Sequence, residues 1–547
     1  MRLSRNPCAV LLFAPVLLFA QVQTAWVRNC VVPGNTSAWP AAIALDRSGA
    51  VYVAGWQGTI DYDVDYVTVK YSSEGAQQWV AQYNSSADSI DKPYAVAVDD
   101  SANVHVTGES WGAGTYYDYT TVRYDSAGVE QWVARYDDSL HDYDGACAVA
   151  VDPKGGILVA GTSTNFILVI KYRPNDSIQW IARYRGPADN YVEARAMAVD
   201  CAGNCFVTGV SQTGNPDHLD YATVKFDSTG ALRWAARYDG PAHDRDMPNA
   251  IAFDSSGDVY VAGASIGIGT DFDYATVKYD SNGTEQWARR YNGPQNYYDG
   301  ASAIRVDRAG NAFVTGASYA TQQGAPDYAT MKYSTSGVLQ WIRTYDGPGQ
   351  GSDAASALAL DSADNVYVTG ESYGGSGSGL DFATLKYDSA GNRLWLIRYN
   401  APDNSTDQAT AMATDGAGNV CVTGRTGNYP AERYTTIKYT QLAGMGQTMT
   451  RHGTDYGIDC VPEPFRDKVE IRLTPRASFA RSTDLQIRDV AGRLVRTFRV
   501  PEASSPAPYT VVWAGTDNFG HAVPAGCYFL TLKSEVRTVQ RRLLLTR

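Results

Sequence analysis

The chain lacks most of the features on which membrane proteins, nucleic-acid-binding proteins and hydrolytic enzymes depend. It has no long apolar stripe of helical period, and after residue 25 no apolar run is long enough for a transmembrane helix. The formal net charge of -12 leaves no basic excess for phosphate contacts, which excludes nucleic acid as the expected partner. The six histidines recur at no repeated place and lie beside no nucleophile: His105, His141, His218, His243, His452 and His521. No catalytic constellation is visible, so we predict that the chain is not an enzyme and assign no catalytic residue.

Cysteine is also scarce. Seven cysteines follow the N-terminal segment, so at least one thiol is unpaired or bonded to another chain. Cys201 and Cys205 flank a hairpin turn, CAGNC, and can form a disulfide across it. No second Cys pair or His pair stands at zinc-ligand spacing, so we predict no metal centre of this type.

Tyrosine and glycine are abundant, with 37 and 51 residues. Tyrosine, like Val and Thr, favours the pleated surface of a sheet, and Gly supplies turns. A chain of 547 residues is too long for one ordinary core. The composition therefore predicts an all-β protein, built as one large repetitive domain or as several domains.

The first 25 residues are typical of a secretory signal peptide. Arg2 and Arg5 form a basic start, and residues 9–20 form an apolar core that is too short for a stable membrane span. Cleavage after Ala20 or after Ala25 fits the sequence. We therefore expect a protein that is exported through the periplasm and is then secreted or held at the outer cell surface.

An internal repeat of about 53 residues occupies most of the chain. Four markers recur in eight units: a Trp strand, a V-[TA]-G segment, a basic-aromatic pair as in TVKY, and an Asp that ends a run such as AIAFD. The repeated tryptophans are Trp26, Trp79, Trp132, Trp180, Trp234, Trp287, Trp341 and Trp395.

Each unit is predicted to form four short strands. In the fifth unit these are residues 250–254, 258–263, 274–280 and 285–291, which show the alternation of period two that strands require. Asp-x-x-Gly segments link strand one to strand two and strand three to strand four, and they suit a type I turn with Gly in the left-handed position. Ala102 and Asp364 replace this Gly in two units. A four-stranded unit repeated around an axis is a β-propeller blade.

The order of the strands predicts how the ring closes. The chain begins with a Trp strand at residues 26–30, and the last unit has three inner strands up to residue 439 but no Trp strand. We predict that the N-terminal strand completes the last blade, which gives an eight-bladed propeller over residues 26–439 and leaves no open sheet edge. The units resemble the bacterial β-propeller repeat family known as SBBP, whose repeat combines GN-x-Y-V-T-G, A-x-V-x-KYD-x-x-G and a Trp. This resemblance implies the fold but no shared activity.

The repeat ends at residue 439. Residues 440–458 are predicted to be a linker rich in Gly, Thr and Gln. Residues 459–547 hold 14 Lys and Arg against 9 Asp and Glu, a net charge of +5, and their strand and turn pattern predicts a small antiparallel β-sandwich.

This last segment resembles the C-terminal domain of type IX secretion sorting sequences and the related Ig-like domain of flagellar hook-assembly proteins. Two positions depart from the pattern, with Glu463 in place of Asn and with Cys527 in the last hairpin. The resemblance implies a sorting or anchoring domain that is recognised by secretion machinery. The matching residues are Pro462, Pro464, Phe465, Asp489, Gly492, Arg493, Trp513, Gly515, Asp517, Pro524, Gly526, Tyr528 and Phe529.

A recurring Asp precedes the third strand of six units. We interpret each carboxylate as an acceptor of backbone hydrogen bonds where a loop enters a strand. The basic residues of TVKY are expected to lay their aliphatic stems on neighbouring aromatic rings. The Asp-Ser-x-Gly turns lack the spaced carboxylates and bidentate Glu of a calcium loop, so no cofactor is expected and Ca²⁺ stays an alternative. The recurring residues are Asp65, Asp118, Asp220, Asp273, Asp327 and Asp381.

The variable loops are the candidate recognition surface. The connections from strand two to strand three, and from one blade to the next, differ between units, and a propeller places them on one face. Their Tyr, Trp, Asp, Ser and Gly supply rigid aromatic area and adaptable hydrogen bonds. The alternative is that these loops only pack on one another. The candidate ligand-binding residues are Trp111, Tyr116, Tyr117, Tyr143, Tyr297, Tyr298, Tyr319 and Tyr373.

The predicted function is that of a secreted or cell-surface β-propeller that binds an extracellular glycan or protein through this face. One alternative is a propeller polysaccharide lyase or hydrolase, which needs two carboxylates that meet across blades. The other alternative is a purely structural envelope protein.

Overall fold

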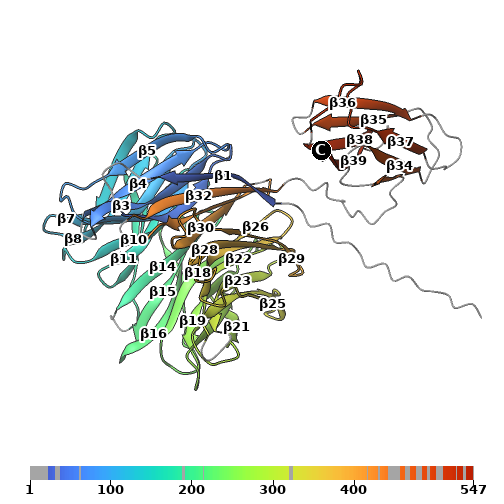
Figure 1. Cartoon of the computed structure of the whole chain (residues 1–547). Coiled ribbons are helices and arrows are strands. Elements are labelled where there is room, and N and C mark those ends of the chain that lie inside the picture. The colour runs from blue at the N-terminus through green and yellow to red at the C-terminus, as the bar shows by residue number, and fades with distance from the viewer. Residues whose placement is uncertain are drawn as a thin grey trace, which may run out of the picture. The chain divides into compact units, whose positions relative to one another are not determined.

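The computed structural model describes two compact β units, residues 1–442 and 443–547 (Figure 1). The residues described are 22–30, 37–60, 63–187, 191–213, 215–319, 324–415, 417–428, 431–441, 456–461, 468–475, 483–489, 493–500, 509–524, 526–533 and 538–545. Every regular element in these ranges is a strand, which confirms the predicted all-β class. No helix in the described ranges has the length and hydrophobicity needed to cross a membrane.

The first unit contains eight four-stranded antiparallel sheets within its described residues, which confirms the eight-bladed propeller. The blades follow the chain in order, and each runs from an inner strand to an outer Trp strand. Blades 1 to 4 are β2 (Ser37–Leu45), β3 (Val51–Ile60), β4 (Asp63–Tyr71), β5 (Gln77–Tyr83); β6 (Asp91–Val98), β7 (Val104–Gly112), β8 (Tyr116–Tyr124), β9 (Glu130–Tyr136); β10 (Asp144–Val151), β11 (Ile157–Ser163), β12 (Phe166–Tyr172), β13 (Ile178–Tyr184); and β14 (Val192–Val199), β15 (Cys205–Thr213), β16 (Asn215–Phe226), β17 (Leu232–Tyr238).

The second half of the ring repeats this order and ends with the N-terminal strand. Blades 5 to 8 are β18 (Asp246–Phe253), β19 (Val259–Ile266), β20 (Phe272–Tyr279), β21 (Glu285–Tyr291); β22 (Asp299–Val306), β23 (Ala312–Tyr319), β24 (Pro326–Tyr333), β25 (Leu339–Tyr345); β26 (Asp353–Leu360), β27 (Val366–Tyr373), β28 (Leu380–Tyr387), β29 (Arg393–Tyr399); and β30 (Asp407–Thr414), β31 (Val420–Thr426), β32 (Arg433–Gln441), β1 (Val22–Cys30).

The ring closes as predicted, because β1 is the outer strand of the last blade. β1 pairs antiparallel with β32 from Val22 opposite Gln441 to Cys30 opposite Tyr434, and Figure 1 shows the two strands side by side. The strand starts at Val22, inside the segment predicted as a signal peptide, whose residues 1–21 lie outside the described residues. Of the two predicted cleavage positions, the one after Ala20 therefore leaves the closing strand whole.

The outer tryptophans join each blade to the next. The Trp287 indole N–H donates to the Thr335 carbonyl of blade 6, at 3.0 Å, and its ring covers Gly337 in the same turn. A Cβ at Gly337 would lie 2.8 Å from that ring, and its φ of 77° also favours glycine. Trp26 makes the same bond to Ser73 of blade 1, at 3.2 Å, so the closing strand also binds the first blade.

The basic residues of TVKY lie against aromatic rings with their charged ends paired, but the group over the ring is the ammonium and not the aliphatic stem that was predicted. Lys278 Nζ lies 4.9 Å from the centroid of the Tyr260 ring and 2.9 Å from the Asp258 carboxylate. Lys386 Nζ lies 4.6 Å from the Tyr367 ring centroid and 3.1 Å from Asp361. These lysines therefore belong to the scaffold of the blades.

The Asp-x-x-Gly turns also form as predicted. Asp254 Oδ1 accepts the N–H groups of Ser256 and Asp258, and Gly257 has a φ of 82°. Ala102 and Asp364 occupy the same left-handed position with φ of 60° and 58°. A Cβ in this region is strained, so the turn of blade 2 pays a conformational cost that the Gly-containing turns do not.

We expect Ala102→Gly to raise the free energy of unfolding by about 0.5–1 kcal/mol. The substitution removes left-handed strain of about 1–2 kcal/mol, and the greater freedom of Gly in the unfolded chain offsets part of the gain. The midpoint of urea denaturation should rise. The control, Gly257→Ala, should lower it by a similar amount, and a fall in the midpoint for Ala102→Gly would contradict the assignment.

The predicted Cys201–Cys205 disulfide does not form, and both residues are free thiols. Cys205 is fully buried in the core between blades 3 and 4, whereas Cys201 is exposed in the turn before β15. The alternation of strand side chains points Cys205 into that core and away from the turn. Burial raises the pKa of the nearby Cys147 thiol to about 12.

The second unit is the predicted β-sandwich. One sheet contains β33 (Tyr456–Val461), β34 (Val469–Pro475) and β37 (Tyr509–Trp513), and the other contains β36 (Leu494–Val500), β35 (Thr483–Asp489), β38 (Gly526–Lys533) and β39 (Thr538–Leu545). Trp513 and Tyr528 meet edge to face in its core, with ring centroids 5.1 Å apart. Most of the predicted linker, residues 442–455, lies outside the described residues, and its ends belong to β32 and β33.

Candidate functional site

Four of the predicted site residues form one aromatic cluster, which we define as Trp111, Tyr116, Tyr117 and Tyr143. The Trp111 ring centroid lies 4.9 Å from that of Tyr116 and 5.0 Å from that of Tyr117, and Tyr117 lies 6.0 Å from Tyr143. The first three residues come from the β7–β8 hairpin of blade 2, and Tyr143 comes from the connection to blade 3. The prediction that these two kinds of loop share one face is therefore correct here.

A buried carboxylate holds this cluster in place. Glu109, on β7, is only 8% exposed and accepts hydrogen bonds from the hydroxyls of Tyr94, at 2.9 Å, and Tyr143, at 2.8 Å. Burial, together with the Glu109 charge, raises the pKa of both hydroxyls above the ordinary value of 10.0, so they remain donors at neutral pH. The rings still reach solvent, since Tyr94 is 42% and Tyr116 is 47% exposed.

The aromatic surface continues onto blades 1 and 8 through residues that the sequence analysis missed. Lys92 lies opposite Glu109 in the pairing of β6 with β7. Its Nζ is 5.6 Å from the centroid of the Trp56 ring. Trp56 stacks on Trp39 with centroids 5.5 Å apart, and the Arg425 guanidinium lies 3.8 Å from the Trp39 ring. Together with the aromatic cluster, these side chains form a row over blades 8, 1 and 2 and the connection to blade 3.

Aligning the repeats on the V-[TA]-G marker would have revealed this row. The residue after the marker Gly is Trp56, Glu109, Glu371 or Arg425 in four blades. In the other four blades it is small or aliphatic, namely Thr162, Val210, Ala264 or Ala317. The variation lies inside a strand, where the search for variable loops did not look.

The other four predicted site residues lie elsewhere on the ring. Tyr297 and Tyr319 meet at 6.2 Å, and Tyr298 packs on Phe272 at 5.6 Å, at the junction of blades 5 and 6. Tyr373, on blade 7, covers the backbone of Gly351, which matches the alternative of loops that pack on one another. The eight candidates therefore do not form a single site.

The axis of the propeller contains a cavity of about 290 Å³ lined by first strands of blades 1, 5, 6, 7 and 8. Most lining residues are small or aliphatic, for example Ala42, Ala250 and Ala411. Arg305 occupies a position that Ala holds in the other seven blades. No carboxylate or histidine lines this cavity within the described ranges.

The Asp before the third strand forms an ion pair in four blades. Asp118, Asp220, Asp273 and Asp381 bind Arg135, Arg237, Arg290 and Arg398, which lie on the outer strand of the same blade. The Asp273–Arg290 distance is 2.7 Å, and the same guanidinium donates to the Ser265 carbonyl. For these four residues the prediction that the carboxylate accepts backbone hydrogen bonds is therefore wrong, because an Arg on the adjacent outer strand binds it instead.

A second recurring Asp, at the start of the first strand in six blades, is the one that accepts a backbone hydrogen bond. Asp246 is fully buried and accepts the N–H of Gly240, six residues earlier. Burial raises the pKa of Asp246 to about 6 and that of Asp407 to about 7. Equivalent bonds are made by Asp91, Asp144, Asp299, Asp353 and Asp407.

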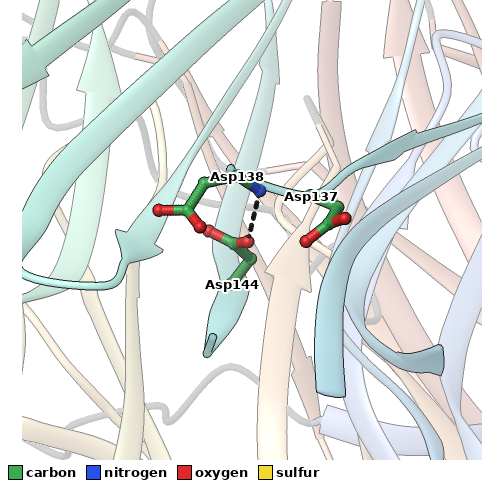
Figure 2. Close-up of side chains that lie close together, drawn as sticks. All are labelled: Asp137, Asp138 and Asp144. Atoms are coloured by element: carbon green, nitrogen blue, oxygen red, sulfur yellow. Dashed lines mark hydrogen bonds between the residues drawn. The ribbon is translucent and has the colours of Figure 1, made fainter. Parts of the chain in front are cut away.

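The two recurring positions crowd carboxylates together where blades meet. Figure 2 shows Asp137, Asp138 and Asp144 at the junction of blades 2 and 3, where Asp144 accepts the N–H of Asp138. In this group and in two others, one oxygen of each carboxylate lies within 4.8 Å of the others. The other two groups are Asp220, Asp239 and Asp246, and Asp327, Asp346 and Asp353.

The fold and these surfaces define the chain as an eight-bladed β-propeller with an exposed aromatic row, joined to an Ig-like β-sandwich. The family model of the beta-propeller repeat (SBBP) matches residues 78–114, and the model of the FlgD Ig-like domain matches residues 466–537. The resemblance of the repeats and of the last domain to these families is thereby confirmed. None of the curated proteins matches the chain.

Solved structures similar to this chain share little sequence with it. A protein of unknown function from Bacteroides caccae is 12% identical, covering 48% of this chain and 84% of its own, with a TM-score of 0.29. PorZ of Porphyromonas gingivalis, a surface component of the type-IX secretion system, is 13% identical, covering 92% and 74%, with a TM-score of 0.31. The β-propeller domain of the Trilobed protease from Pyrococcus furiosus is 9% identical, covering 66% and 98%, with a TM-score of 0.38. At these scores the likenesses carry no inference about what this chain binds.

Proposed function

We propose that the propeller is a non-catalytic binding module that recognises a carbohydrate through the aromatic cluster and Glu109. The observation that carries the proposal is the pair of Tyr hydroxyls anchored on one buried carboxylate, Tyr94 and Tyr143 on Glu109. The anchored rings lose little conformational freedom on binding, which favours affinity. An exposed cluster of aromatic rings over a carboxylate combines apolar faces with hydrogen-bond acceptors.

Sugars match this combination of groups. The apolar C–H face of a sugar ring packs on an aromatic ring, and its hydroxyls donate to a carboxylate that retains free acceptor capacity. The row from Tyr117 through Lys92 to Trp39 is extended, so it suits several consecutive residues of a polysaccharide. A protein partner would require a broad surface of about 800 Å² on each side, whereas this row is narrow.

A binding role also agrees with the axial cavity. Acid-base hydrolysis of a glycosidic bond needs two carboxylates across the bond. The cavity lining, with Arg305 and small side chains in its described part, favours binding over hydrolysis. The signal-peptide pattern and the Ig-like domain support export to the cell surface or beyond, where polysaccharides are accessible.

The test is a glycan array probed with the chain from residue 21 onward, followed by titration of the best ligand. We expect Tyr117→Ala/Tyr143→Ala to weaken binding at least tenfold, because both stacking faces and one anchored hydroxyl are lost. The matched control is Tyr297→Ala/Tyr298→Ala, which removes two tyrosines, 42% and 41% exposed, from a different junction and should leave the affinity unchanged.

Two results would contradict the proposal. The first is an array on which the wild-type chain binds no glycan. The second is an equal loss of affinity in both double variants, which would place the ligand elsewhere or report only a general loss of folding.

A further inference from the structure

Arg305 departs from the repeat at the axis of the propeller. It lies on β22, the first strand of blade 6, and it lines the axial cavity of about 290 Å³. The other seven blades have Ala at this position, so the fold of a blade does not require a guanidinium there. The Arg305 side chain is exposed and is not part of the packed core. A charge that the scaffold does not need, placed in a cavity, is a candidate for ligand binding.

The Arg305 guanidinium has no acidic partner. Its Nη1 donates to the Ile304 carbonyl at 2.8 Å, and in the described part of the chain it forms no ion pair. None of the described residues that line the cavity is acidic. At the blade junctions, by contrast, four arginines are bound by Asp, as Arg290 is by Asp273. Arg305 therefore keeps N–H donors that can bind an anion.

Three hydroxyls line the same cavity. Ser302, Ser356 and Thr410 occupy equivalent positions in blades 6, 7 and 8, so the symmetry of a propeller places them at one height along the axis. Each stands where the pairing of the first two strands shifts by one residue. A residue at such a bulge is left out of the strand ladder, and the bulge re-aims its side chain. Among the described residues none of the three hydroxyls has a hydrogen-bond partner, so each can bind a ligand.

The remaining wall of the cavity is apolar. It includes Ala42 and Ile43 of blade 1 and Ala250 of blade 5. Small-molecule sites have volumes of about 300–1,000 Å³ and combine a mostly apolar wall with a few polar groups, as this cavity does. Ser302 and Arg305 are three positions apart on one strand, so their Cα atoms are separated by roughly 10 Å. The hydroxyls and the guanidinium therefore meet different parts of a ligand.

We propose that the axial cavity binds a sugar acid, whose carboxylate pairs with Arg305 and whose hydroxyls bind Ser302, Ser356 and Thr410. A guanidinium binds a carboxylate through two parallel hydrogen bonds. The Ser and Thr hydroxyls both donate to and accept from sugar hydroxyls, and the C–H groups of the sugar pack on the apolar wall. A simple inorganic anion would engage Arg305 and leave most of the cavity, which has room for roughly ten water molecules, without a partner.

The test is calorimetric titration of the chain from residue 21 onward with sodium glucuronate and sodium galacturonate. We expect one site for at least one of these sugar acids, and an affinity at least tenfold lower in Arg305→Ala. This variant carries the residue of the other seven blades and should fold normally. The matched control is Arg308→Ala, which removes the same charge three positions later, outside the cavity lining, and should keep the wild-type affinity.

Matched probes test the class of ligand. Glucose has the hydroxyls without the charge, and acetate and inorganic phosphate have the charge without the sugar ring, so each should bind at least tenfold more weakly than the sugar acid. A trimer of galacturonate distinguishes two sources of the sugar acid. Binding of the trimer at least as tight as that of the monomer identifies the end of an acidic polysaccharide, and weaker binding of the trimer identifies a free sugar acid.

Three results would overturn the proposal: no binding of either sugar acid, an equal affinity for acetate or phosphate, or equal losses in the Arg305 and Arg308 variants. The site is separate from the aromatic cluster, whose residues do not line the cavity. Tyr117→Ala/Tyr143→Ala should therefore leave the affinity for the sugar acid unchanged, so that this proposal and the proposed function fail separately.

Discussion

Removal of residues 22–30 is expected to lower the Tm of the propeller by about 10 °C or more. The deletion strips β1 from the last blade and exposes the backbone of β32 from Tyr434 to Gln441 as an open edge. It also removes Trp26 from the core that it shares with Val51 and Tyr71 of blade 1. Loss of one buried Trp costs about 3–5 kcal/mol, and each kcal/mol lowers Tm by about 2–4 °C in a domain of 150–250 residues.

The control is a chain that starts at residue 22. It lacks the predicted signal peptide up to Gln21 but keeps the whole closing strand, so it should melt like the longer chain. Far-ultraviolet circular dichroism, which reports the strand content, would follow the thermal transition of both chains. Trp26→Ala should fall between them, since it retains the strand pairing but loses the contact with the Ser73 carbonyl. Similar melting of the deletion and its control would show that the closing strand is not needed.

Arg290→Met is expected to destabilise the propeller by about 2–3 kcal/mol at pH 8 and by much less at pH 5. The substitution keeps the aliphatic stem but leaves Asp273 without its partner, beside the buried Asp299. Breaking a buried ion pair by removing one member costs about 3–5 kcal/mol, and the partial exposure of Arg290 reduces this value.

The direction in which the stability of the Arg290→Met variant changes with pH can be judged from Asp65 and Asp327, which form no ion pair with an Arg in the described part of the chain. Burial raises the pKa of Asp65 to about 6, and burial with the charges of Asp346 and Asp353 raises that of Asp327 to about 7, against an ordinary value of 3.8. A raised folded-state pKa contributes stability that is complete below about pH 4 and is lost as pH rises to about 7. Without Arg290, Asp273 should join this group, so the variant should recover as the pH falls to 5.

The measurement is urea denaturation of wild type and variant at both pH values. Arg290→Met/Asp273→Asn is the compensating control, because it removes the unpaired charge and should restore most of the loss at pH 8. A loss of equal size at pH 5 and pH 8 would show that packing of the Arg stem, and not the charge, supports the junction.

Much of the architecture could be predicted because it depends on local patterns. The Trp period, the strand alternation and the Asp-x-x-Gly turns each involve residues a few positions apart, and the missing Trp strand after residue 439 predicted the closure by residues 26–30. The disulfide prediction failed for the opposite reason. Spacing brought Cys201 and Cys205 near each other in sequence, but only packing decided that Cys205 enters the core between blades.

The candidate sites were only partly predictable. Trp111, Tyr116 and Tyr117 lie in one hairpin, so their proximity follows from the sequence, whereas Glu109 was missed because it lies inside a strand. The recurring Asp residues were visible, but their partners were not. Arg290 is 17 residues after Asp273. No local sequence pattern indicates that an Arg on the outer strand binds the Asp at the start of the third strand.

The amino-acid sequence determined the all-β class, the eight units, their turns and the closure of the ring, since these follow from periodicity and turn chemistry within each unit. Tertiary structure decided which loops meet, which carboxylates converge and which of them receive a counter-charge. The physical reason is the geometry of a propeller, which brings the end of an outer strand, the start of a third strand and the first strand of the next blade to one junction. Asp327, Asp346 and Asp353 meet there although they span 27 positions of the chain.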